Sequence, residues 1–274
     1  MSALYETLRD CLRHEAPVAL ATIVARDDGD RTARAGELGA KLLLRPDAPV
    51  LGSLGDPGLD RAVTRDLAAA LELGRSATRR YGPHGESRQA EVTVFLEAFA
   101  APAQMVIFGA MDFSAALARL AKLLGYRVSV CDARAVFATA ARFPMADEVA
   151  VEWPDRHLAR VGPSLGARDA VCVLTHDVKF DVPAILGALA TGVGYIGAMG
   201  SRRTVAARER RLREAGVTAG DLARVRSPIG LDIGARTPEE TAVSICAEII
   251  AARANRRAGE PLSAGAGPIH AAPG

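Results

Sequence analysis

The stretch "VIFGAMDFSAALARL", residues 106–120, decides the fold of the C-terminal part of the chain. An apolar strand ends at Gly109 and an amphipathic helix follows at once, which is how a dinucleotide-binding unit begins. Such a unit needs two further glycines, one for close approach of the pyrophosphate and one for helix–strand packing. Met111 and Ser114 occupy those two positions. The stretch therefore predicts a doubly wound scaffold whose first loop has lost tight dinucleotide binding.

The sequence on either side of this loop continues the same pattern. Short apolar segments alternate with amphipathic ones, which is typical of a parallel sheet covered by helices. The last helix should start with a capping box, because Thr237 precedes Pro238 and Glu240. We expect strands at 105–109, 127–131, 148–151, 170–174 and 193–197, and helices at 113–124, 154–161, 182–190, 203–215 and 238–254.

The N-terminal part has a different character. It contains a predicted helix at 3–14, predicted strands at 18–25, 40–45 and 91–99, and a helix that Asp56 caps and Gly74 ends. The fold class expected is α/β, with a C-terminal doubly wound (Rossmann-like) parallel sheet preceded by a smaller α+β N-terminal domain. The expected domains are 1–100 and 101–255. Residues 256–274 form a tail too poor in apolar residues to order itself.

Composition limits the functions that the chain can have. The 274 residues carry a formal charge of +2 and only 4% aromatic residues, which argues against a nucleic-acid partner. Cys11, Cys131, Cys172 and Cys246 are scattered, as is typical of a reducing compartment. No apolar run approaches the ~20 residues of a membrane span, and no secretory signal is visible. We therefore expect a cytoplasmic protein.

Polar residues gather where the predicted parallel strands end, the edge at which open α/β sheets bind ligands. Asp132 follows the second strand, where a carboxylate could bind ribose hydroxyls, and Arg134 beside it would favour a 2′-phosphate. The loop "THDVKFD", residues 175–181, is a second such place. Asp181 could instead cap the next helix. The ligand candidates here are Gly109, Asp132, Arg134, His176, Asp177 and Lys179.

The loop "YIGAMGSRRT", residues 195–204, suggests an anion site. Cations are unfavourable at a helix N-terminus, so Arg202 and Arg203 make sense if an anion binds between them and the free N–H groups. Ser201 could cap the helix, and Gly197 and Gly200 would allow an unusual backbone. The later arginines of the helix are interpreted as a solvated basic face: Arg208, Arg210, Arg211 and Arg213.

The loop "SPIGLDIGARTPEE", residues 227–240, places Asp232 and Arg236 among apolar residues and glycines such as Gly234. Two interpretations stay open. These charges could bind a ligand, or they could form a buried pair that holds the loop.

Taken together, these three loops closely resemble, in order and spacing, the XdhC/CoxI family of xanthine dehydrogenase accessory proteins, over about residues 106–253. "LGAKLLL" followed by "LGSLG" is similar to the family's N-terminal domain. The resemblance implies a non-catalytic maturation factor for molybdenum hydroxylases. Such a factor binds the molybdenum cofactor (molybdopterin), protects it while a cysteine desulfurase supplies its terminal sulfur, and delivers it to the apo-enzyme. On this hypothesis Ser201, Arg202 and Arg203 bind the phosphate, and Asp232 or Asp177 reads the pterin edge.

The chain departs from the family pattern in its cysteines. Family members carry a cysteine just after the position of "GSLG" and another before the strand at 91–99. This chain has "DPGLD" and "ESRQA" at these places and no cysteine between Cys11 and Cys131. Thiolates are the natural ligands of a molybdenum–sulfur centre, so their absence argues against direct metal ligation. Two alternatives stay open: the chain could hold only the organic part of the cofactor, or it could have changed its metal ligand.

Two other functions stay open. One is an NAD(P)-dependent oxidoreductase that uses Asp132 and Arg134 for the cofactor and His176 or Lys179 as proton donor. The other is a ligand-free subunit that pairs with a cysteine-containing paralogue. A homodimer is also compatible with the sequence.

Overall fold

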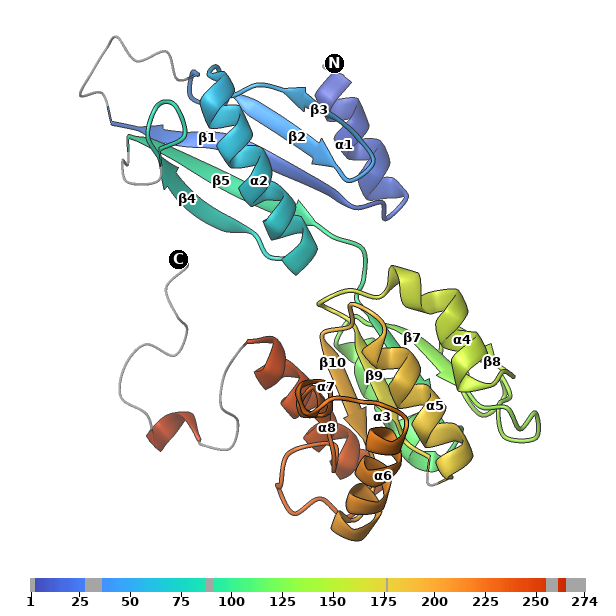
Figure 1. Ribbon diagram of the computed structural model, residues 1–274. Helices are drawn as coiled ribbons and strands as arrows, with labels where there is room; N and C mark the ends of the chain where they lie inside the picture. Colours follow the sequence, from blue (N-terminus) through green and yellow to red (C-terminus); the bar gives the residue numbers. More distant parts are fainter. Residues whose placement is uncertain (1–2, 28–35, 87–90, 176, 255–260, 265–274) are drawn as a thin grey trace. The chain divides into compact units, whose positions relative to one another are not determined.

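The computed structural model describes residues 3–27, 36–86, 91–175, 177–254 and 261–264. The chain divides into two compact units, one that extends to Ala101 and one that begins at Pro102 (Figure 1). Among the described residues, no helix combines the length and apolarity that crossing a bilayer requires.

The N-terminal unit is an antiparallel sheet with strand order β3-β2-β1-β5-β4 and a helix on each face. Alternate residues of β1 point to opposite faces: Ala19 and Ala21 pack with α2, whereas Val18 and Leu20 pack with α1. The predicted cap Asp56 and helix end Gly74 are confirmed. The elements are α1 (Ala3–Arg13), β1 (Val18–Arg26), β2 (Lys41–Arg45), β3 (Ala48–Gly52), α2 (Pro57–Leu73), β4 (Ala77–Tyr81) and β5 (Val92–Phe99).

The second unit is a six-stranded parallel sheet with strand order β11-β10-β9-β6-β7-β8. This is the strand order of dinucleotide-binding folds, and it confirms the predicted doubly wound sheet. The strands are β6 (Gln104–Phe108), β7 (Arg127–Cys131), β8 (Glu148–Ala150), β9 (Ala170–Val173), β10 (Tyr195–Ala198) and β11 (Val225–Arg226). The helices are α3 (Asp112–Leu123), α4 (Pro154–Val161), α5 (Val178–Leu189), α6 (Arg202–Glu214), α7 (Ala219–Ala223) and α8 (Pro238–Arg253), with short 3₁₀ turns η1 (Gly162–Ser164) and η2 (Leu262–Ala264).

Helices cover both faces of this sheet. The apolar side chains of α3 and α8 pack on one face, around Ile107 and Cys172. Those of α4, α5 and α6 pack on the other face, around Phe108 and Val173. The sheet is therefore buried on both sides, which explains why its strands are continuous apolar runs.

Two predicted starts differ from the structure by more than one residue. Helix α5 begins at Val178 rather than at 182, because Asp177, not Asp181, is its N-cap. Strand β10 covers Tyr195–Ala198, so it starts two residues later than expected. The capping box of Thr237 and Glu240 at the start of α8 is confirmed.

Candidate ligand site at the carboxyl edge of the sheet

The loops singled out in the sequence come together because the central strands end at the same level. Phe108 pairs with Cys131 on one side and with Val173 on the other, and Val173 pairs with Ala198. The segments that follow β6, β7, β9 and β10 therefore leave the sheet at one edge (Figure 1).

Asp132 lies at this edge, but its carboxylate is fully used by the chain itself. It is buried and accepts hydrogen bonds from the Ala110 N–H at 3.0 Å, from the Arg134 N–H at 2.9 Å and from two nitrogens of the Arg134 guanidinium at 2.9 and 2.8 Å. Burial alone would raise the pKa of Asp132, yet these hydrogen bonds outweigh it and lower the pKa. The expected interaction of Asp132 with ribose hydroxyls is not available in this arrangement.

The polar groups of the first loop, after β6, also make their hydrogen bonds within the protein. Gly109 has φ +104°, and a Cβ there would lie 2.8 Å from the Thr175 side chain, so this glycine serves the turn. Ser114 donates its hydroxyl to the Gly109 carbonyl. Met111 precedes α3 without a capping side chain, and the Ala110 N–H points to Asp132. The loss of dinucleotide binding at this loop stays a prediction.

The loop after β9 separates into a cap and a buried network. The Asp177 carboxylate accepts the Lys179 N–H at 3.0 Å, and this cap lies at the surface. His176 lies outside the described residues. Asp181 is buried, accepts the Thr175 hydroxyl, and forms an ion pair with Arg208 at 2.7 Å. The interpretation of Asp181 as an N-cap is therefore wrong.

Arg208 is a second correction, because it is not part of a solvated basic face. Its guanidinium is buried and donates to Asp181, to the Met199 carbonyl at 2.7 Å and to the Ser227 hydroxyl at 3.0 Å. This one side chain joins the segments that follow β9, β10 and β11. Its burial follows from its position on α6, one turn before the buried Leu212.

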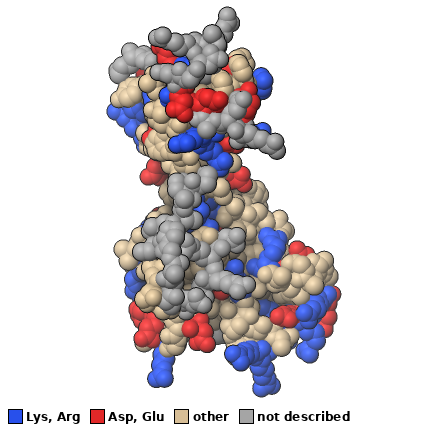
Figure 2. Space-filling model, turned by 90° about the vertical axis from the view of Figure 1, so that its left-hand side faces the viewer, with Lys and Arg blue, Asp and Glu red and all other residues tan. Residues whose placement is uncertain are grey.

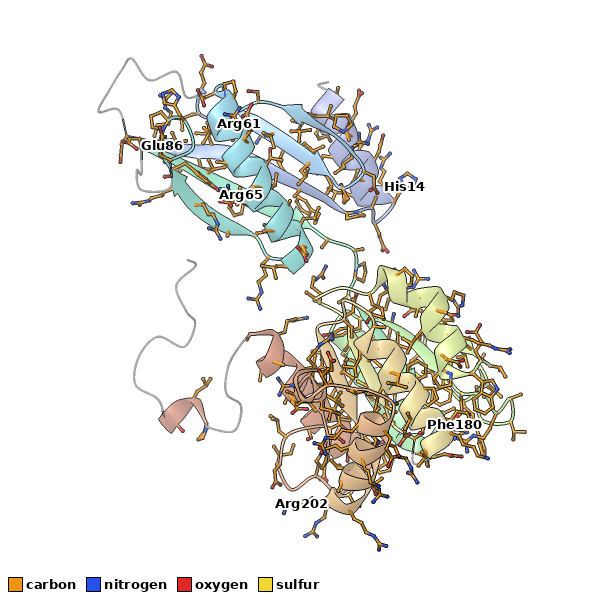
Figure 3. The ribbon with its side chains drawn as sticks, in the orientation of Figure 1. His14, Arg61, Arg65, Glu86, Phe180 and Arg202 are labelled. Atoms are coloured by element: carbon orange, nitrogen blue, oxygen red, sulfur yellow. The ribbon has the colours of Figure 1, made fainter. Side chains whose placement is uncertain are left out.

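The segment after β10 leaves two arginines exposed. Ser201 is the N-cap of α6 and accepts the Thr204 N–H. Arg202 and Arg203 begin the helix, and Figure 3 shows Arg202 at its start. Within the described part of the chain neither guanidinium makes an ion pair. Gly200 lies in the loop. Gly197 does not, because it is a buried residue of β10 and packs against Ile229.

The third loop is held by groups other than Asp232 and Arg236. Glu248 accepts the Tyr195 hydroxyl at 2.6 Å and the Gly230 N–H at 2.9 Å, and burial of the Tyr195 ring raises its pKa. Asp232, Gly234 and Arg236 are all exposed, and Gly234 has φ +75°. Among the described residues no ion pair joins Asp232 to Arg236, so the alternative of a buried pair is wrong.

Sequence reasoning missed an aromatic cluster at the same edge. The Trp153 ring, shortly after β8, stacks on the Phe180 ring in α5, with centroids 4.8 Å apart and an interplanar angle of 14°. The Arg134 guanidinium lies 4.6 Å from the Phe137 centroid and 5.8 Å from that of Phe180. The signal in the sequence is the placement of the single tryptophan close after a strand.

Two of the cavities among the described residues of this unit lie at different places. The smaller, about 170 Å³, lies at the carboxyl edge and is lined by Ala110, Met111, Asp112, Arg134, Phe137 and Arg142. The larger, about 630 Å³, lies between α4, η1 and α5 near Thr191 and Gly192, which precede β10. It is lined by apolar groups such as Leu158 and Leu186 and is away from the polar loops. Of the two, the smaller cavity is the one at the edge to which the polar loops belong.

The three cysteines of this unit are buried: Cys131, Cys172 and Cys246. Burial raises the pKa of Cys131 to about 12 and that of Cys246 to about 11, and it also raises the pKa of Cys172. Among the residues that the structure describes, no cluster of His, Cys, Asp and Glu could hold a metal ion. The exposed charges of each sign are interspersed over the face shown in Figure 2.

Comparison with known proteins identifies the family. Residues 105–249 match the XdhC Rossmann domain, and residues 11–82 match the XdhC and CoxI family. The chain belongs to the XdhC and CoxI family. Both units of the structure are thus family domains, as the three loops and "LGAKLLL" with "LGSLG" predict.

Individual relatives agree. YqeB of Escherichia coli K12 is 29% identical over 255 residues, which cover 89% of this chain and 45% of YqeB. A Bacillus subtilis protein named as a probable component of xanthine dehydrogenase is 31% identical over 186 residues, 68% of this chain and 53% of that protein. The molybdenum cofactor insertion chaperone PaoD of Escherichia coli is 33% identical over 84 residues, 31% of this chain and 26% of PaoD. This chain therefore spans about half the length of the first two relatives, and its match to PaoD is shorter.

A solved structure shows the same fold. A protein of Bacillus halodurans described as a xanthine dehydrogenase superposes with a TM-score of 0.52 at 21% identity, over 96% of this chain and 99% of that one. At this identity the match supports the two-unit architecture and no more.

Proposed function

We propose that this protein is an accessory factor that binds the molybdenum cofactor and assists its insertion into a xanthine dehydrogenase-type molybdenum hydroxylase. The names of the relatives support this role: one is a probable component of xanthine dehydrogenase and another is a molybdenum cofactor insertion chaperone. The proposed partners are the apo-enzyme and a cysteine desulfurase that sulfurates the cofactor. The cofactor is cargo, and no turnover by the chain itself is proposed.

The observation that carries the proposal is the exposed pair Arg202–Arg203 next to the N-cap Ser201, at the edge where α/β sheets bind ligands. The cofactor carries a phosphate. Two guanidiniums at a helix N-terminus, where free N–H groups also point outward, are suited to bind it. The loop is therefore complementary to the organic part of the cofactor.

Among the described residues of this unit, the metal end of the cofactor finds no exposed thiol. Cys131, Cys172 and Cys246 are buried, and their raised pKa values keep them as neutral thiols. The chain is thus suited to hold the pterin and phosphate and to leave the molybdenum free for a partner. An NAD(P)-dependent reaction is disfavoured, because Asp132 is saturated and Met111 replaces the second glycine.

The test is anaerobic purification of the full chain from a host that makes molybdopterin, followed by quantification of bound pterin. We expect the wild-type protein to carry pterin. The double variant Arg202→Ala, Arg203→Ala should carry at least about tenfold less, because each charge-assisted hydrogen bond is worth about 1.5–3 kcal/mol and about 1.4 kcal/mol is tenfold.

The matched control is Arg210→Ala, Arg211→Ala, which removes two exposed arginines from the same helix and should not change the pterin content. Wild-type protein without pterin would contradict the proposed function. Equal pterin in both double variants would contradict the phosphate assignment.

A further inference from the structure

The single tryptophan of the chain is exposed at the edge where ligands bind. Trp153 is 43% exposed although Phe180 stacks on one face of its indole. Exposed aromatic rings are notable in a chain with only 4% aromatic residues. Phe137 nearby is 38% exposed, and Val136 and Val151 are exposed as well. Such a concentration of apolar surface indicates a binding site rather than a packing remnant.

The cluster is built from three separate segments and held rigid. Trp153 follows β8, Phe180 belongs to the first turn of α5, and Arg134 follows β7. The buried Asp132 fixes the Arg134 guanidinium through hydrogen bonds of 2.9 and 2.8 Å. Arg134 in turn lies within cation–π distance of both Phe137 and Phe180. Asp132 is therefore a positioning residue for this cluster.

A cavity adjoins the cluster and shares two of its residues. The cavity of about 170 Å³ is lined by Arg134 and Phe137, and Arg142 lies 5.7 Å from the Phe137 centroid. Pockets that enclose a whole ligand measure roughly 300–1,000 Å³, so this cavity has room for only part of one. Trp153 is not one of the residues that line the cavity; it is connected to Arg134 through Phe180, and its exposed indole offers a flat surface for a ring.

We propose that Trp153, Phe180 and Arg134 form a stacking subsite for the planar heteroaromatic ring of the pterin. The inference rests on the proposed function, since it assigns the ring of that same ligand to a place in the site. Stacking on an aromatic face tolerates many rings, and a nearby arginine favours those with electron-rich oxygen substituents. The ring lies against Trp153, and Arg142 and Arg134 line the adjoining cavity.

Ligand binding can be measured by the fluorescence of Trp153, because it is the sole tryptophan. The probe is 6-carboxypterin, titrated into the full wild-type chain, and a parallel titration of free N-acetyltryptophanamide corrects for the light that the pterin itself absorbs. We expect saturable quenching of the Trp153 emission. Adenosine monophosphate is titrated in parallel as a second planar ring with an anionic group. Tighter binding of the nucleotide than of the pterin would overturn the pterin assignment.

Equilibrium dialysis of 6-carboxypterin then measures variants that lack the fluorophore. Trp153→Ala should weaken binding by about 5- to 150-fold, the range found when a stacked aromatic residue is replaced by alanine. Trp153→Phe keeps a ring and should bind nearly as well as the wild type. Tyr5→Ala removes a similarly exposed aromatic ring, 51% exposed, from the N-terminal unit and should have no effect. Far-UV circular dichroism confirms that each variant is folded.

The two proposals fail in different ways. If wild-type protein carries pterin from the host but Trp153→Ala binds 6-carboxypterin as tightly as wild type, the cofactor role stands and the stacking subsite is wrong. If 6-carboxypterin leaves the Trp153 emission unchanged, the subsite is likewise wrong. Wild-type protein that carries no pterin from the host refutes the cofactor role itself.

Discussion

The ion pair between Asp181 and Arg208 is the buried charge on which the carboxyl edge of the sheet depends. Both side chains are almost fully buried, and Arg208 also reaches Met199 and Ser227. Replacing Arg208 by leucine would leave the Asp181 carboxylate buried without its counter-charge. We expect Arg208→Leu to lower the free energy of unfolding by about 3–5 kcal/mol.

Urea unfolding followed by Trp153 fluorescence measures this change, since the tryptophan lies in the same unit. Arg211→Leu is the matched control: Arg211 is an exposed arginine of the same helix, and its replacement should stay within about 0.5 kcal/mol. A similar midpoint for the two variants would show that the buried pair does not stabilise the fold.

For single residues the sequence predicts less than it does for helices and strands or for the class of each unit. Arg208, Arg210, Arg211 and Arg213 look alike in the stretch "RERRLR", and only Arg208 is buried. Its spacing of four from Leu212 is a signal that could have separated it from the others. The partner of Arg208 depends on how α6 packs against α5. A local sequence pattern does not predict this packing. The same holds for Trp153 and Phe180, which come from segments far apart in the sequence.

Individual helices and strands are predicted well where their caps are in the sequence. Asp56 with Gly74 and Thr237 with Glu240 mark α2 and α8 correctly. The predicted start of α5 is misplaced, because Asp177 and Asp181 are both acceptable caps and Pro183 favours the later one. Strands β3 and β4 escape prediction because both are edge strands with few buried residues, so they show no apolar alternation.

The cap of α5 allows a test of what Asp177 does. Its side chain accepts the Lys179 N–H, which satisfies a free donor at the helix start. Asp177→Ala should therefore lower the free energy of unfolding by about 1 kcal/mol, whereas Asp177→Asn keeps an oxygen acceptor and should cost much less. Urea midpoints of the two variants measure the difference.

Pterin binding by the same two variants separates the cap from a ligand role. If Asp177 serves only as a cap, both variants bind 6-carboxypterin as the wild type does. Loss of binding in Asp177→Asn, at unchanged stability, would instead assign the carboxylate to the pterin edge, as the sequence hypothesis has it.

Over the whole molecule, the class of each unit follows from periodicity, and the strand order does not. Continuous apolar strands alternating with helices predict a parallel sheet. They do not predict that β6 and β9 lie side by side at its centre, as they do in the doubly wound order. The altered loop at Met111 shows why fold and function separate here. The scaffold has the packing glycine Gly109, whereas Met111 and Ser114 stand where a dinucleotide-binding loop has its two further glycines.

The final prediction concerns how the two units unfold. Each of the four clusters of buried apolar side chains among the described residues draws on one unit alone. Because these clusters share no side chain between the units, we expect each unit to unfold in its own transition. Leu67 is fully buried between α2 and the antiparallel sheet, so Leu67→Ala should lower the stability of the N-terminal unit by about 2–5 kcal/mol.

Two probes of one urea titration show whether the two units unfold separately. Far-UV circular dichroism reports both units, whereas Trp153 fluorescence reports the Rossmann unit only. In Leu67→Ala the first dichroism transition should move to lower urea while the fluorescence midpoint stays in place. Leu117→Ala, a buried leucine of α3, should do the reverse and shift the fluorescence midpoint. A fluorescence midpoint that moves in Leu67→Ala would mean that the units unfold together, and the stability of the ligand site would then depend on the N-terminal unit.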